Sequence, residues 1–308
     1  MKIPVLLVAF NRPYKTQKVL EAIASYFPDE LYVAVDGPRE GKIGELEKVQ
    51  RVRELAKEGI HAKKVIPFFH EKNLGCRLGV PTAVTKFFEN VDYGVILEDD
   101  CVPCQDFWDF MEFGLTYFHD DTRIGHINGN CLISIDNPDS SFYFSHLNHV
   151  WGWGSWRRAW RTYSVSVDET ETTIRNVLSS LFPMHQYIQE WWLNHISMAA
   201  RGDIATWDYQ WTFTLWKEGQ VCVTPVQNLV VNIGFDEEAT HTQDDTCPGF
   251  NLRFGSLKPP YQLPRTRTTN VQLDFKELAS HYRIEKPKPE KFTKVIKRKI
   301  KNLLGIKA

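Results

Sequence analysis

The sequence predicts an α/β fold, with a mostly parallel sheet flanked by helices. Between residues 3 and 100, runs of apolar β-forming residues alternate with stretches of helical spacing, as they do when helices connect parallel strands. The strand-like runs are apolar throughout, which is typical of strands that are covered on both faces. Each run ends in polar or turn-forming residues, and open α/β sheets bind their ligands at the carboxyl ends of the strands.

Four strands and three helices are expected in this part of the chain. The strands are expected at residues 3–10, 31–38, 64–75 (running into a loop) and 93–100. The helices, with apolar residues at three- and four-residue spacing, are expected at residues 16–26, 44–59 and 80–89. The strand ends carry Asn11-Arg12, Asp36-Gly37, Asn73-Leu74-Gly75 and Glu98-Asp99-Asp100. Parallel strands end at the same edge, so these groups predict a site along one edge of the sheet.

The second part of the chain is rich in aromatic residues. A helix is expected at residues 107–118, and residues 149–160 hold four tryptophans. Residues 221–234 are strand-like, with several valines. From residue 256 the chain is rich in Pro, Thr and Arg, so we expect residues 256–285 to wrap over the surface.

Charge is distributed unevenly along the chain. The net charge is −1, but residues 286–308 carry nine Lys or Arg and one Glu, a balance of +8. The first 285 residues therefore carry the remaining −9, and the chain as a whole is not expected to bind nucleic acid. The basic tail places apolar and cationic residues at helical spacing, which is typical of a membrane-surface anchor. A helix packed on the acidic body and an unstructured tail remain as alternatives.

The apolar N-terminal run is interpreted as a strand of a cytoplasmic protein. It contains a single Lys, has no small-residue cleavage site and continues directly into Asn11-Arg12-Pro13, unlike a secretion signal. No stretch of the sequence reaches the roughly 20 apolar residues of a membrane span. Any membrane contact is therefore expected to be peripheral, through the basic tail at the inner face of the membrane.

The most informative motif is the acidic triplet Glu98-Asp99-Asp100, which directly follows the fourth expected strand. Adjacent carboxylates repel one another and are costly to bury. Mg²⁺ and Mn²⁺ take carboxylate oxygens as ligands and often share their coordination sphere with substrate phosphates. The triplet therefore indicates a divalent-cation site. The alternative is a solvated turn with surface acids.

An ordered set of short motifs resembles the GT-A nucleotide-sugar glycosyltransferases. In chain order these motifs are AFNRP, VDGP, NLGCRLG, EDD, WGWGSWRRAW and WDYQW, within residues 3–245. The triplet resembles the Glu-Asp-Asp motif of the N-acetylglucosaminyltransferase I family, and bacterial family-2-like glycosyltransferases carry something similar. The resemblance implies a GT-A fold, a Rossmann-like mostly parallel sheet flanked by helices. It also implies a single catalytic domain over residues 1–255, with a nucleotide-binding half (1–103) and an acceptor and sugar half (104–255).

The resemblance places a UDP-sugar along the strand ends. The implied nucleotide contacts are Phe10, Asn11, Arg12, Asp36, Asn73, Gly75, Arg77, Glu98 and Asp99. Arg12 would contact phosphate, Asp36 would accept a hydrogen bond from the uracil ring, and Asp99 would contact the ribose. Each has a structural alternative: Arg12 as a surface arginine, Asp36 as a turn residue before Gly-Pro, and Gly75 as a turn glycine.

The cation and the catalytic base are assigned in the same way. Asp100, the last acid of the triplet, would ligate Mn²⁺ or Mg²⁺, and His241 is a second candidate ligand that could equally be an incidental loop histidine. Asp208 lies among aromatic residues, which would raise its pKa and exclude water, so it is the candidate general base. Its alternative is a helix N-cap. One base opposite the leaving group implies inversion by direct displacement.

Aromatic side chains are expected to line the sugar and acceptor pocket, because their faces stack on sugar rings. The candidates are Trp151, Gly152, Trp153 and Trp207, with the glycine allowing close approach. Trp156 and Trp160 lie four residues apart and are expected in the core.

Together these features predict an inverting, metal-dependent hexosyl- or N-acetylhexosaminyltransferase. The expected acceptor is a glycan or a lipid-linked glycan, in polysaccharide biosynthesis. The QxxRW pattern of processive synthases is absent from the sequence, so transfer of a single sugar is expected. The alternative is a GT-A protein that binds carbohydrate or nucleotide without turnover. A nucleotidyltransferase is disfavoured because AFNRPYK contains no glycine for a phosphate loop.

Overall fold

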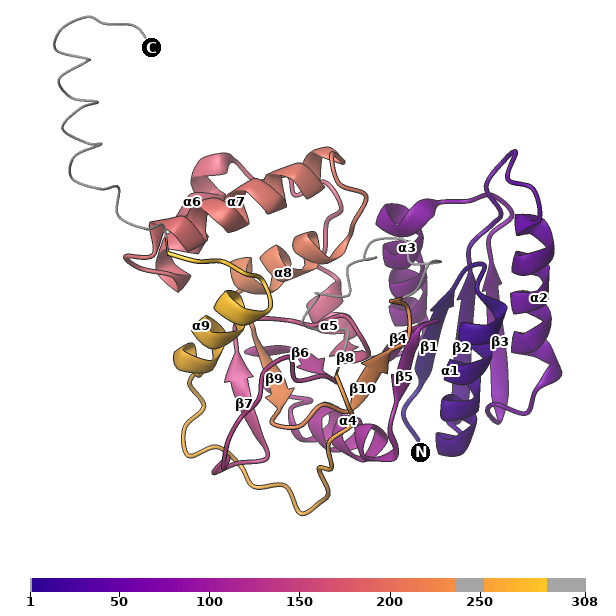
Figure 1. Cartoon of the computed structure of the whole chain (residues 1–308), viewed down its shortest axis with the longest axis horizontal. Helices are drawn as coiled ribbons and strands as arrows, with labels where there is room; N and C mark the ends of the chain where they lie inside the picture. Colours follow the sequence, from indigo (N-terminus) through magenta and orange to yellow (C-terminus); the bar gives the residue numbers. More distant parts are fainter. Residues whose placement is uncertain (1, 236–251, 287–308) are drawn as a thin grey trace, which may run out of the picture.

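The structure is a computed structural model that describes residues 2–235 and 252–286. Figure 1 shows the chain as a broad sheet with helices on both faces. His241 and all but the first residue of the basic tail lie outside the described residues. Within the described residues, no helix is long and apolar enough to cross a membrane.

The first part of the chain folds as alternating strands and helices, as predicted. The strands are β1 (Val5–Ala9), β2 (Glu30–Val35), β3 (Lys64–Phe69) and β4 (Tyr93–Glu98). The helices between them are α1 (Pro13–Tyr26), α2 (Glu45–Glu58) and α3 (Gly75–Asn90). All neighbouring pairs among these four strands are parallel, so their carboxyl ends share one edge.

The second part extends the same sheet in a different order. Its strands are β6 (Ile124–Asn128), β7 (Phe142–Ser145), β8 (Trp153–Trp156) and β9 (Val221–Pro225). The order across the eight described strands is β3-β2-β1-β4-β8-β6-β9-β7. β8 runs antiparallel to β4 and β6, and β7 runs antiparallel to β9, whereas β6 and β9 are parallel. The sheet is therefore mostly parallel, as predicted, with antiparallel pairings at β8 and β7.

Shorter elements and further helices surround this sheet. A two-stranded ribbon pairs β5 (Cys101–Pro103) with β10 (Val230–Asn232). The remaining described helices are α4 (Gln105–Tyr117), α5 (Arg157–Trp160), α6 (Glu171–Leu181), α7 (Gln186–Arg201), α8 (Asp208–Lys217) and α9 (Val271–Ser280). Helices α6, α7 and α8 lie together at the top of Figure 1, above the second part of the sheet.

Burial on both faces explains why the strands are apolar at every position. Along β1, Val5 and Leu7 enter one hydrophobic cluster, and Leu6, between them, enters the cluster on the opposite face. Successive side chains of a strand point to opposite faces, so a strand with both faces covered needs apolar residues throughout. Each fully buried side chain of this kind contributes about 1.5–3 kcal/mol relative to an exposed one.

Residues 256–285 do more than wrap over the surface. Helix α9 lies within this segment, and its Asp274 and Glu277 are buried. Asp274 accepts hydrogen bonds from Ser145 and from the backbone and ring nitrogens of His146. Glu277 lies 2.6 Å from Nε2 of His149. The expectation of a purely superficial wrap is thus wrong for α9, because these buried acids anchor it to the segment that follows β7.

Candidate functional site

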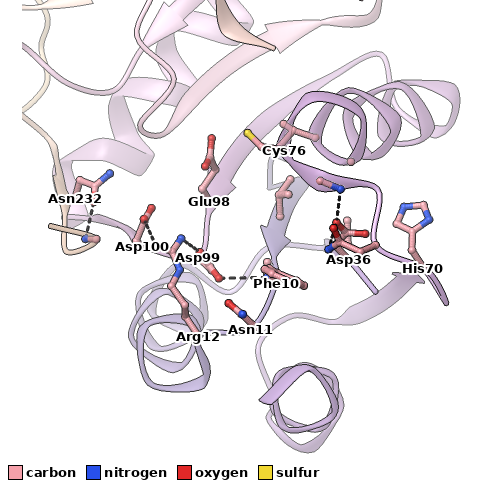
Figure 2. Close-up of a pocket in the computed structure, with 18 of the residues that line it drawn as sticks. Phe10, Asn11, Arg12, Asp36, His70, Cys76, Glu98, Asp99, Asp100 and Asn232 are labelled. Carbon is pink, nitrogen blue, oxygen red and sulfur yellow. Dashed lines mark hydrogen bonds and ion pairs between the residues drawn. The ribbon is translucent and has the colours of Figure 1, made fainter. Parts of the chain in front are cut away.

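The carboxyl ends of β1, β2, β3 and β4 meet at one cavity of about 550 Å³. Most of the residues expected to bind nucleotide or metal line it: Phe10, Asn11, Arg12, Asp36, Asn73, Gly75, Glu98, Asp99 and Asp100. Trp151 lines the cavity too. Figure 2 shows the labelled side chains around this cavity. The volume is within the range of about 300–1,000 Å³ that is typical of small-molecule sites.

Arg12 offsets the repulsion within the acidic triplet. Its Nη1 lies 2.8 Å from Oδ2 of Asp100, and its Nη2 pairs with Oδ1 of Asp99. Asp99 also accepts a hydrogen bond from the backbone N–H of Phe10 at 3.2 Å. Burial raises the pKa of the Asp99 carboxyl, and Arg12 opposes that shift. The carboxylates at the end of β4 are therefore held by the loop that follows β1.

Glu98 behaves differently from the other two acids. Its carboxyl group points away from Arg12, toward the side of Cys76 (Figure 2). Burial and then the charges of Asp100 and Asp99 raise the pKa of Glu98 to about 8. Within the described part of the chain it accepts no hydrogen bond, so its oxygens are available to a ligand.

Asp36 organises the loop that leads into α3. Its carboxylate accepts hydrogen bonds from the backbone N–H groups of Gly37, Leu74 and Gly75 at 2.8–2.9 Å. Asn73 donates to the same carboxylate at 3.0 Å. Gly75 has a φ of +72°, a conformation that favours glycine. Asp36 thus has the turn role that the sequence left open, and it also lines the cavity.

Arg39 and His70 are among the cavity residues that were not expected from the sequence. Arg39 lies over the ring of Phe10, with its guanidinium carbon 5.5 Å from the ring centroid. It pairs with Glu45, which also accepts a hydrogen bond from the Asn11 side chain at 3.0 Å. His70 follows β3 and lines the cavity beside Asp36. Neither residue belongs to a motif that pointed to a site, although His70 stands at a strand end, where polar groups that bind ligands are expected.

A second cavity of about 490 Å³ adjoins the first. Cys76, Glu98 and Trp151 line both cavities, so these three residues lie at their boundary. The second cavity has a largely aromatic wall, formed by Trp151, Trp191, Trp192, Trp207, Tyr209 and Tyr282. Trp207 and Asp208, both predicted site residues, line only this second cavity.

Asp208 is the first residue of α8. Its Oδ1 accepts hydrogen bonds from the Thr206 hydroxyl and from the backbone N–H of Tyr209, the latter at 3.0 Å. In the described residues nothing donates to Oδ2, so one carboxylate oxygen is free to accept a proton. The residue before it, Trp207, occupies the N-cap position, so Asp208 itself does not.

Three predicted site residues lie elsewhere. Trp153 has 0% exposure and lines neither cavity, because β8 is an interior strand and its ring packs against His126 and Trp207. Arg77 donates to the backbone oxygens of Val165, Ala199 and Ala200, which ties α3 to α7. Gly152, with φ of +74°, supports the chain next to Trp151 without lining either cavity. The sugar role expected of Trp153 is therefore wrong, and Arg77 is directed away from the first cavity.

The described residues contain no group of three His, Cys, Asp or Glu side chains that could hold a metal ion. Asp100 faces the first cavity, close to Asn232, and its Oδ2 pairs with Arg12. Mg²⁺ is often held by one or two carboxylates together with substrate phosphates. Among the described residues, Asp100 is thus the carboxylate that would hold such a cation.

Comparisons with known proteins do not assign a function to this chain. No protein-family model matches the chain, and no curated protein sequence matches it. Among solved structures, apo mouse xyloside xylosyltransferase 1 is 11% identical, with a TM-score of 0.34, over 80% of this chain and 86% of that one. A putative glucose-1-phosphate thymidylyltransferase from Bacillus anthracis, in complex with a sucrose, is 9% identical, with a TM-score of 0.38, over 82% and 98%. The glycosyltransferase GlyE of Streptococcus pneumoniae TIGR4 is 10% identical, with a TM-score of 0.33, over 72% and 45%.

Proposed function

We propose that the protein is a glycosyltransferase that moves one sugar from a UDP-sugar to a hydroxyl group of a glycan or lipid-linked glycan. The observation that carries this proposal is the pair of adjoining cavities. One cavity lies at the carboxyl ends of parallel strands and is lined by Arg12 and the acidic triplet, whereas the other includes six Trp and Tyr residues and presents the carboxylate of Asp208. The motif order that resembles the GT-A enzymes supports the same function.

The first cavity suits a nucleotide diphosphate. Phe10 and Arg39, whose guanidinium carbon lies 5.5 Å from the Phe10 ring centroid, provide flat groups against which a base can pack. Arg12 provides a planar cation that can pair with phosphate oxygens. The Asp36 carboxylate fixes the loop at residues 73–75, which would lie against the nucleotide.

Asp208 is proposed as the general base of an inverting displacement. Its carboxylate takes the proton from the acceptor hydroxyl as the hydroxyl oxygen forms a bond to the anomeric carbon of the donor. The bond from that carbon to the UDP oxygen breaks, and UDP leaves with the electron pair. A divalent cation, when bound with the diphosphate at Asp100, would neutralise charge on the leaving group. Glu98, at the boundary of the cavities, can hydrogen-bond the sugar between them.

The experiment is a calorimetric titration of UDP with Mn²⁺ or with EDTA. We expect UDP to bind with Mn²⁺ and to bind more weakly with EDTA, and Asp100→Ala to remove the difference. Asp120→Ala is the matched control, because Asp120 is exposed and lies outside both cavities. No UDP binding by the folded protein under any condition would contradict the proposed donor. Equal binding with Mn²⁺ and EDTA would contradict the metal requirement alone.

A membrane-bound acceptor would suit the basic tail. Residues 288–301 contain most of the positive charge of the tail, interspersed with apolar residues. Such a segment can adsorb to an anionic lipid surface while the catalytic body stays in water. The proposed location is therefore cytoplasmic, at the inner face of the membrane.

A further inference from the structure

The wall of the second cavity contains a buried amide that has no partner. Asn130 follows β6, has 0% exposure and lines the cavity. In the described part of the chain, neither its Nδ2 nor its Oδ1 has a hydrogen-bond partner. Leaving a buried polar group unpaired costs about 1–3 kcal/mol. The fold bears this cost at a cavity wall, where a ligand can supply the missing bonds.

Asn128 shows that this part of the chain can satisfy a buried amide. It lies two residues before Asn130 and is equally buried. Its Nδ2 donates to Leu147 O at 3.0 Å and to Thr224 Oγ1 at 2.8 Å, and its Oδ1 accepts from His149 N at 2.6 Å. Among the buried amide side chains of the described residues, Asn130 alone has neither side-chain atom paired, and it lies at the wall of the second cavity.

The rest of the wall is suited to a sugar ring. Aromatic rings pack on the C–H faces of a pyranose, and the partly exposed rings of this wall are those of Trp151, Trp191, Tyr209 and Tyr282. Trp192 and Trp207 are buried behind them. Polar groups that could bind hydroxyl groups are also present, including Asn148 and Thr206. A wall of aromatic faces with a few convergent polar groups is typical of a small-molecule site, and here those groups match ring faces and hydroxyl groups.

The charges of the cavity select against anions. The described lining residues include no Lys or Arg, and they include two acids, Glu98 and Asp208. His149 is paired with Glu277, and burial lowers the pKa of His281 to about 4, so that ring is neutral near pH 7. A carboxylate or phosphate on a sugar would meet the carboxylate of Asp208 here, with no Lys or Arg among the described lining residues to pair with it.

We propose that the second cavity is the acceptor subsite for a neutral pyranose, which Asn130 hydrogen-bonds and the aromatic wall stacks upon, and that the cavity rejects uronic acids and sugar phosphates. The assignment of this subsite to the acceptor rests on the proposed function, whereas the binding of a neutral sugar is proposed independently of it. The hydroxyl that reacts would lie at Asp208, on the side where the two cavities adjoin.

Saturation-transfer NMR on the full chain tests this proposal. The probes are the methyl α- and β-glycosides of glucose, galactose, mannose and N-acetylglucosamine, with methyl β-glucuronide as the charged partner of methyl β-glucoside. We expect at least one neutral glycoside to bind and the glucuronide to bind at least tenfold more weakly than methyl β-glucoside or not at all. If no neutral glycoside binds, or if the glucuronide binds as well as methyl β-glucoside, the proposal is wrong.

Asn130→Leu identifies the site and Asn128→Leu controls for the fold. Leu is close to Asn in shape and removes an unpaired amide, so Asn130→Leu should keep or raise the melting temperature and weaken glycoside binding at least tenfold. Asn128→Leu breaks satisfied bonds and should lower the melting temperature. A folded Asn130→Leu variant with unchanged glycoside affinity would overturn the assignment of Asn130.

The UDP titration separates this inference from the proposed function. UDP binding without glycoside binding would leave the donor site in place and overturn the acceptor subsite. Glycoside binding that is sensitive to Asn130→Leu, without UDP binding, would leave the sugar site in place and overturn the transferase. The two sites are lined by different residues apart from Cys76, Glu98 and Trp151, so each result can be read on its own.

Discussion

Arg12 and the acidic triplet illustrate how single residues set the chemistry of the first cavity. Two adjacent carboxylates, Asp99 and Asp100, can stay close together because one guanidinium contacts both. Removing one partner of a buried ion pair is strongly unfavourable, because it leaves a charge without compensation. A diphosphate that enters the cavity would compete with these carboxylates for Arg12. A divalent cation at Asp100 would then compensate the released acid, which links nucleotide and cation binding.

Asp208→Asn tests the proposed base. The amide keeps the size of the side chain but cannot take a proton, so we expect transfer to fall by a factor of about 10²–10⁴. UDP affinity should stay within about twofold of the wild type, because Asp208 does not line the first cavity. The measurement is the rate of UDP release from UDP-sugars in the presence of methyl glycosides, alongside calorimetry.

Asp203→Asn is the matched control for that experiment. Asp203 lies in the loop between α7 and α8, pairs with Arg201 at the surface and lines neither cavity. Its substitution should leave both transfer and UDP affinity unchanged. An Asp208→Asn variant with wild-type turnover would assign the base to another group and remove the argument for inversion.

The sequence could predict individual site residues where their position along a strand was informative. Asp99 and Asp100 follow a strand of unbroken apolar residues, so their place at the sheet edge was predictable. Trp153 was misplaced because a tryptophan-rich run does not reveal which of its members enter the sheet. Asn130 was missed because the signal is the absence of partners, and only the fold reveals which polar groups are left unpaired.

At the scale of elements, the periodicity of apolar residues decided what could be foreseen. The strands of the first part were predictable because both of their faces are buried. Helix α9 was not predicted as part of the core, because two of its buried residues are acids, Asp274 and Glu277. Those acids are buried against His146 and His149, which lie about 130 residues earlier in the chain. Local pattern cannot reveal a buried charge whose partner is so distant.

The buried ring of His126, between strand β6 and helix α8, is expected to make the stability of the fold depend on pH. Its Nε2 donates to His149 O at 3.0 Å, and its Nδ1 accepts from Trp211 Nε1 at 3.1 Å. Burial lowers the pKa of His126 to about 3. A histidine with a lowered pKa in the folded state stabilises the fold above its unfolded pKa, near 6.5. That contribution is lost as pH falls toward 3.

We therefore expect His126→Gln to flatten the pH dependence of stability. In the wild type, His126 should lower the free energy of unfolding by up to about 1.4 kcal/mol per pH unit below pH 6.5. The variant should be less stable at pH 7.5, because it loses two buried hydrogen bonds, and should lose less stability on acidification. Urea unfolding at pH 7.5, 6.0 and 5.0 measures both slopes. Parallel slopes would show that His126 is already protonated in the fold or is not buried.

At the scale of the whole molecule, β8 joins the two parts of the sheet and brings the two cavities together. It pairs with β4 on one side and β6 on the other, both antiparallel. The segment before it carries Trp151, which lines both cavities. The parallel direction of the strands in the first part was predictable, because a helix connects each strand to the next along the chain. The order β8-β6-β9-β7 depends on long-range pairings, which leave no local pattern.

We expect UDP binding to depend on the body and vesicle binding to depend on the tail. The described lining residues of both cavities precede residue 283, so deletion of residues 287–308 should leave UDP affinity unchanged. Full-length protein should co-sediment with phosphatidylglycerol vesicles and the truncated protein should not, because each Lys or Arg near an anionic surface contributes about 1 kcal/mol. Binding should fall between 0.05 and 0.5 M salt, as screening lengths shorten from above to below about 10 Å.

Neutral phosphatidylcholine vesicles are the control for this last experiment, because they keep the apolar surface and remove the charge. Equal sedimentation of full-length and truncated protein would place any membrane contact on the body. If truncation instead lowers the melting temperature without changing sedimentation, the tail packs on the acidic body, whose net charge of −9 offers it a surface of opposite sign. The same deletion thus decides between the two roles that a basic amphipathic tail can have beside an acidic body.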